Sequence, residues 1–173
     1  MHLFARMLSH QYEAALQTLR SCIERCRTSQ WHESHGDQPF SQVVFHTIFY
    51  ADYYLGRDAW PFKEQPFHVA HRQEFASYEE LEDVLPVLLY ERSFCLEYLG
   101  HVQGKLQRVL AEETFDILLG PSGISFRSMG RAELHIYGIR HIQHHAAQLG
   151  LRLQVLDGEP MKWVTGEAHH QGS

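Results

Sequence analysis

Two histidines four residues apart, His141 and His145, are the strongest candidates for functional chemistry in this 173-residue sequence. Residues 128–156 have the apolar periodicity of a helix, which places the two side chains one turn apart on one face, about 5–6 Å apart at Cβ. Two imidazoles at that spacing can bind one ion at about 2.0–2.1 Å each. Such pairs also arise by chance in a chain with 14 histidines, and His144 offers a second pairing with His141.

A third histidine, His46, supports a metal site independently. It lies in a predicted helix on the same face as Val43, Phe49, Tyr50 and Tyr53. A histidine in this aromatic stripe is expected to be buried, and a buried imidazole needs a polar partner. A backbone carbonyl or a tyrosine hydroxyl would serve, but two further histidines on a facing helix favour a metal, because bundle cores commonly hold metal sites.

The donor set predicts which ions fit. Three neutral imidazoles suit zinc, nickel, copper or ferrous iron better than magnesium or calcium. Three protein ligands leave coordination positions open, as in catalytic zinc sites, and an open position would hold water or a thiol with a lowered pKa.

Four long helices are predicted to position these residues. They cover residues 3–27, 41–55, about 78–110 and 128–156, and a short helical turn covers 113–119. Ser41 and Gly56 are expected to begin and end the second helix. Ser77–Glu80 fits a capping box at the start of the third. Pro86 should kink or divide that helix, whose apolar pattern includes Leu88 and Leu89.

The helix pattern predicts an all-α fold. With no strand alternation, residues 1–156 are expected to form a single four-helix-bundle domain. Residues 57–76 contain two prolines and no clean period, so they are predicted to be a long surface loop, which permits a crossover connection. Residues 157–173 are expected to be a partly mobile tail.

The composition indicates which partners and which cellular compartment to expect. The formal net charge of −6 provides no basic surface for nucleic acid. No apolar run approaches the roughly 20 residues that cross a bilayer, and the first 27 residues lack the apolar core of a signal peptide. Three cysteines are not a disulfide framework, which favours a reducing compartment, so a cytoplasmic protein without membrane or nucleic-acid partners is expected.

Other side chains are weaker candidates. Tyr50, Tyr53 and Tyr137 could hydrogen-bond a metal-bound group, although core packing explains them as well. Gln148 could orient a ligand from behind. Arg140 and Arg152 could meet a cofactor carboxylate, with solvation as the alternative.

The remaining cysteines and histidines have simple interpretations. Cys22 and Cys26 share a helix face and could bind metal or form a redox pair, but small buried side chains are the more common role, and Cys95 fits the core. His68 and His71 are expected to be exposed in the long loop unless that loop covers the site. His169 and His170 near the terminus are expected to be mobile.

Two segments carry a family resemblance. Residues 45–47 (FHT), followed within about ten residues by 54–56 (YLG), resemble the second-helix signature of the DinB/YfiT-like metalloenzymes. Residues 141–149 (HIQHHAAQL) resemble the fourth-helix signature, in which a histidine pair precedes glutamine-leucine. The specific part is about twenty residues long, although the order of motifs fits from the first helix to the last. Ala146–Ala147 stand where many members have Arg-Gly, so contacts there are expected to differ.

The resemblance implies more than the residues do alone. It implies a DinB-like four-helix bundle with His46, His141 and His145 as ligands of one divalent metal, often nickel or zinc, and frequently a homodimer. Characterised relatives include transferases that use bacillithiol, mycothiol or glutathione, whereas many members have no assigned reaction. A metal-dependent transferase or hydrolase that activates a thiol or water for a small-molecule substrate is therefore expected. The alternatives are a non-catalytic metal-binding stress or interaction protein, and a chance histidine cluster.

Overall fold

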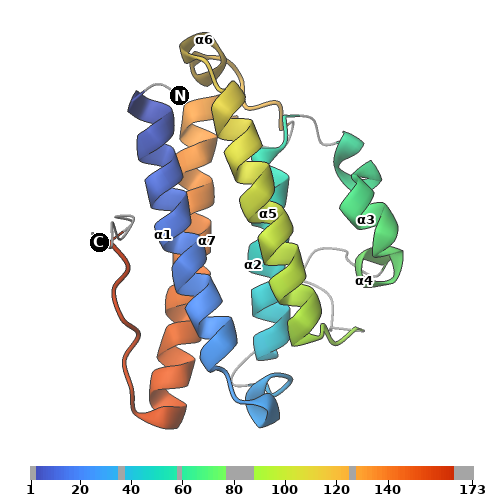
Figure 1. The fold of residues 1–173 in the computed structure, drawn as a ribbon, viewed down its shortest axis with the longest axis vertical. Coiled ribbons are helices and arrows are strands. Elements are labelled where there is room, and N and C mark those ends of the chain that lie inside the picture. Colours follow the sequence, from blue (N-terminus) through green and yellow to red (C-terminus); the bar gives the residue numbers. More distant parts are fainter. Residues whose placement is uncertain (1–2, 35–37, 58–59, 77–87, 125–127, 166–173) are drawn as a thin grey trace, which may run out of the picture.

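The computed structural model describes residues 3–34, 38–57, 60–76, 88–124 and 128–165. Within these ranges the regular structure is helical, apart from two isolated β-bridges, so the prediction of an all-α chain is confirmed for them. The four long helices are α1 (Leu3–Arg25), α2 (Phe40–Leu55), α5 (Arg92–Glu112) and α7 (Arg131–Asp157) (Figure 1). None of the described helices has the length and apolar character needed to cross a membrane.

The long helices pack in a closed set of contacts. α1 packs against α5 and α7, and α2 packs against the same two helices. In Figure 1, α1 and α7 run down the page while α2 and α5 run up, so the α1–α5 and α2–α7 contacts join antiparallel helices and the α1–α7 and α2–α5 contacts join parallel ones. The core between them consists of apolar side chains at helical spacing, such as Leu16, Ile48, Leu106 and Leu149.

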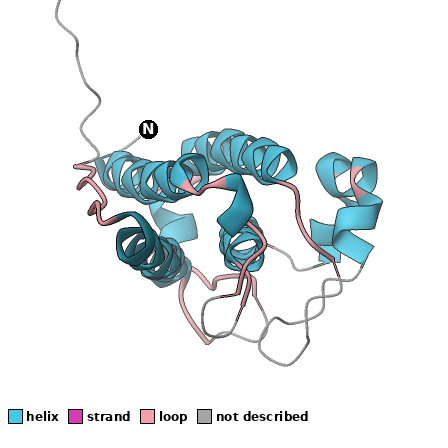
Figure 2. Cartoon of the chain, turned by 90° about the horizontal axis from the view of Figure 1, so that it is seen from below, coloured by secondary structure: helices cyan, strands magenta, loops and turns pink. Residues whose placement is uncertain are grey.

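Because α2 and α5 are parallel, the chain between them must run back from the end of α2 to the level where α5 begins (Figure 1). Residues 57–76 form the first part of this connection and are called the returning segment here. The prediction of a loop without regular structure was wrong, because this segment contains η2 (Trp60–Glu64), α3 (Pro66–Ala70) and α4 (Arg72–Ala76). α3 and α4 lie to one side of the long helices (Figure 2). Phe67 stacks on Tyr98 of α5 at 5.2 Å between ring centroids, so packing stabilises helices too short to form alone.

Two predicted helix boundaries were wrong. α2 begins at Phe40 after Pro39, so Ser41 lies inside the helix, where its Oγ is 3.1 Å from Nδ1 of His32. Leu88 and Leu89 precede α5, which begins only at Arg92. Gly56 ends α2 as predicted. The capping box at 77–80 and Pro86 lie outside the described residues.

The last long helix, α7, ends at a glycine, and the extended segment after it is anchored to α1. Gly158 has a left-handed backbone (φ 80°), and its N–H donates to the carbonyl of Gln154. Arg25 of α1 then binds the Asp157 carboxylate at 3.2 Å and the Glu159 carbonyl at 2.9 Å. The part of the predicted tail up to residue 165 therefore has anchoring contacts at its start, and residues 166–173 lie outside the described chain.

Candidate metal centre

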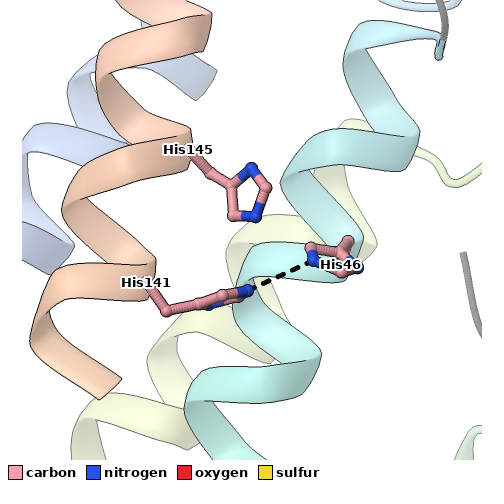
Figure 3. A group of neighbouring side chains, drawn as sticks. All are labelled: His46, His141 and His145. Carbon is pink, nitrogen blue, oxygen red and sulfur yellow. Dashed lines mark hydrogen bonds between the residues drawn. The ribbon is translucent and has the colours of Figure 1, made fainter. Parts of the chain in front are cut away.

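The structure brings His46 of α2 together with His141 and His145 of α7 (Figure 3). One ring nitrogen from each lies within 4.8 Å of the others, and Nε2 of His46 is 3.2 Å from Nε2 of His141. The His145 ring centroid is 4.7 Å from that of His46 and 4.6 Å from that of His141. Among the described residues, no carboxylate or thiol joins the three within that distance.

These distances suit one shared ion. Two nitrogens bound at about 2.0–2.1 Å to a tetrahedral ion lie about 3.3–3.4 Å apart. The His46–His141 pair is already near that separation, and the His145 nitrogen lies within 4.8 Å of both. Without an ion, one Nε2 of the close pair can donate to the other, so a plain histidine–histidine hydrogen bond is the alternative explanation of the contact.

The local environment keeps the imidazoles of His46 and His145 neutral. All three are half-buried, so His46 is less buried than its aromatic stripe predicted. Burial, followed by the neighbouring His145, lowers the pKa of His46 to about 3, and burial also lowers the pKa of His145. Nδ1 of His46 is buried without a hydrogen-bond partner among the described residues. Neutral imidazoles with accessible lone pairs are the form that binds a transition metal.

Gln148 orients one of the three rings. Its Oε1 accepts a hydrogen bond from Nδ1 of His145 at 2.8 Å, across one turn of α7. Because that bond places the proton on Nδ1, Nε2 keeps its lone pair, and Figure 3 shows the His145 ring directed from α7 toward His46. The sequence singled out Gln148 for such a role, and its contact is with His145.

Aromatic rings border the histidines on one side. The Tyr50 ring centroid lies 4.8 Å from that of His46 and 5.5 Å from that of His141, both edge-on. Tyr54 also meets His141, at 5.8 Å, and Tyr137 packs on Tyr54 at 5.3 Å. Of the predicted tyrosines, Tyr50 therefore reaches the histidines directly, whereas Tyr137 contacts their neighbour.

The remaining candidates lie elsewhere. His144 is exposed and outside the trio, with its ring 5.0 Å from that of His145. Arg152 donates to the carbonyl of Gln38 at 2.8 Å, and Arg140 is exposed. The cysteines are free and buried, as expected of core side chains, and burial raises the pKa of the Cys22 thiol to about 12 and that of Cys26 to about 11.

A buried ion pair fixes α2 and α7 relative to each other near one end. Arg131, at the start of α7, donates to the carbonyls of Leu55 and Gly56 at the end of α2, at 3.0 and 2.8 Å. Its Nε also binds Glu113 at 2.8 Å, and Glu113 accepts from Nε2 of His135 at 3.2 Å. Since α2 and α7 carry the three histidines, this network helps to set the site's geometry.

A second buried network fastens the returning segment. His68 is 3% exposed, so its expected exposure was wrong. Its Nε2 lies 2.8 Å from Oδ2 of Asp52, which also accepts from the Tyr98 hydroxyl at 2.9 Å, while Oδ1 binds Lys105 at 2.5 Å. Sequence reasoning missed this cluster, although one signal was available: Asp52 is a charged residue in an otherwise apolar stretch of α2.

No family model, no curated protein and no solved structure matches this chain.

Proposed function

We propose that this chain is a DinB-like four-helix bundle, with a crossover between α2 and α5, that binds one divalent metal through His46, His141 and His145. The convergence of three imidazoles from two helices carries the proposal, since it gathers ligands that suit zinc or nickel. The signature-like segments supply the DinB resemblance. The packing of α2 and α5 on common neighbours in the same direction supports the crossover.

We infer that the leading activity is that of a metal-dependent transferase or hydrolase. An ion held by three imidazoles supplies Lewis acidity that lowers the pKa of a thiol or water at an open position. The partial exposure of all three histidines supports access from outside. Tyr50, edge-on to two of the rings, is placed to contact an incoming group. A low-molecular-weight thiol is the proposed co-substrate.

One observation favours a second function, a non-catalytic metal-binding stress or interaction protein. The described residues place no carboxylate within 4.8 Å of all three histidine nitrogens, where one could act as a base. Under this alternative the ion stabilises the packing of α2 on α7. Access to the ion distinguishes the two functions, because a catalytic site must admit a thiol or water.

Metal analysis tests the ligand assignment. Untagged protein purified without a metal column should contain close to one nickel or zinc per chain, and His141→Ala should lose it. His144→Ala is the matched control, because His144 is exposed and lies outside the trio; it should retain the metal. One-to-one metal in His141→Ala, or equal loss in both variants, would reject the assignment.

Cobalt substitution tests whether the site admits a thiol. Adding glutathione to the cobalt-loaded protein should produce a thiolate-to-cobalt absorption band if a position is open. An unchanged spectrum would reject the thiol co-substrate and leave a water-activating hydrolase or the non-catalytic function. A homodimer in the cytoplasm is part of the proposal, and light scattering of the purified chain tests the dimer.

A further inference from the structure

A small pocket separate from the three histidines lies between α2 and the returning segment. It has a volume of about 170 Å³ and is lined by Phe49, Lys63, His68, Arg72 and Phe75. Drug-sized ligands usually occupy about 300–1,000 Å³, so this pocket suits a more compact molecule. Its lining has an unusual composition: two cations, two phenyl rings, one buried imidazole and no acid.

The buried imidazole is held rigidly. Asp52 binds Nε2 of His68 at 2.8 Å, and the ring stacks on Phe75 at 3.9 Å between centroids. Since Asp52 accepts a hydrogen bond from Nε2 of His68, the proton is placed on Nε2 and Nδ1 carries the lone pair.

The charges at the pocket are positive and uncompensated. Lys63 and Arg72 are both exposed, and neither forms an ion pair with the described residues. The negative charge of Asp52, behind His68, is already paired with Lys105 at 2.5 Å. An oxyanion entering the pocket would therefore meet two free cations, of which the arginine fork matches a carboxylate in geometry.

The phenyl rings specify the rest of the ligand. Phe49 and Phe75 lie 6.4 Å apart between centroids and supply apolar walls. We propose that this pocket binds a small organic carboxylate with a flat apolar body, whose carboxylate lies between Lys63 and Arg72. The pocket shares no lining residue with the three histidines.

Titration with benzoate, followed by NMR on the full chain, tests the proposal. Benzoate should bind saturably and shift the imidazole signals of His68, and neutral benzamide should bind at least tenfold more weakly. The double variant Lys63→Gln/Arg72→Gln should weaken benzoate binding at least tenfold. Arg6→Gln/Arg27→Gln is the control, because it removes two exposed cations outside the pocket; it should leave the affinity unchanged.

Several outcomes would overturn the inference. Equal affinity for benzoate and benzamide would remove the role of the carboxylate, and inorganic phosphate binding as tightly as benzoate would remove that of the phenyl walls. Unchanged affinity in the double variant would place binding elsewhere. If the double variant does not fold, as judged by circular dichroism, Lys63→Glu gives the same test. His141→Ala should bind benzoate normally, which separates this inference from the metal proposal.

Discussion

Nδ1 of His145 lies 2.8 Å from Oε1 of Gln148, on the next turn of α7. This contact gives the third histidine a defined proton position and ring orientation. It also leaves the Nε2 lone pair of His145 available on the face of α7 that meets α2, whereas His144 is exposed. The contact is the most direct means of perturbing the proposed ion without touching a ligand.

Gln148→Leu should weaken metal binding by about 10–100-fold, because the His145 ring loses the group that fixes its tautomer. Gln148→Glu should keep or increase the affinity, since a carboxylate accepts the same hydrogen bond more strongly. Competition with a chromophoric chelator measures both. Gln154→Leu, also exposed on α7, is the control and should bind like the wild type. Identical affinities in all three variants would contradict the orienting role of Gln148.

Glu113 should make stability depend on pH in acid. Burial raises its pKa, but the hydrogen bonds and charges of His135 and Arg131 outweigh burial and lower the pKa from 4.5 to about 2. The stabilisation is therefore present above about pH 4.5 and is lost as the pH falls toward 2. Glu113→Gln should cost about 3–5 kcal/mol at pH 7, because it leaves a buried arginine without its carboxylate.

Urea unfolding at a series of pH values checks this prediction. The difference in unfolding free energy between wild type and Glu113→Gln should narrow as the pH falls from 4.5 to 2. Glu112→Gln, at the exposed neighbouring position, should follow the wild type throughout. A difference that stays constant with pH would show that Glu113 is not the titrating group.

Tyr98→Phe should loosen the returning segment. The substitution removes only the hydroxyl that donates to Asp52 at 2.9 Å, in a side chain with no exposed surface. A hydrogen bond to a charged group contributes about 1.5–3 kcal/mol, so that loss is expected in urea unfolding. Amide hydrogen exchange should also accelerate over residues 66–76 more than in α1. A uniform change across the chain would argue that the hydroxyl does not hold this segment.

Two glycines should respond to alanine in opposite directions. At Gly100 in α5 an added Cβ meets nothing within 4 Å, so Gly100→Ala should stabilise the chain by about 0.5–1 kcal/mol. At Gly123 the backbone has φ 80°, and a Cβ would lie 1.7 Å from the Arg57 carbonyl oxygen. Gly123→Ala should therefore cost at least about 2 kcal/mol. Thermal unfolding of both variants measures the contrast, and equal shifts would contradict it.

The features best predicted from the sequence were those that depend on helical periodicity. Apolar spacing located the long helices, and the 141/145 spacing placed two histidines on one face, because both follow from the period of 3.6 residues. The five-residue helices of the returning segment were missed, since pieces so short depend on tertiary contacts. The Asp52 network was missed for a related reason: its partners His68 and Lys105 lie 16 and 53 residues away.

The Nε2 atoms of His46 on α2 and His141 on α7 lie 3.2 Å apart, although the two residues are 95 positions apart in the sequence. Only the pair on α7 can meet before α2 docks, so we expect the complete ligand set to form late in folding. An ion that binds after the rate-limiting step should leave the folding rate nearly unchanged and slow unfolding instead. The bound metal would then increase the kinetic stability of the folded protein, and its removal would shorten the lifetime of the native state.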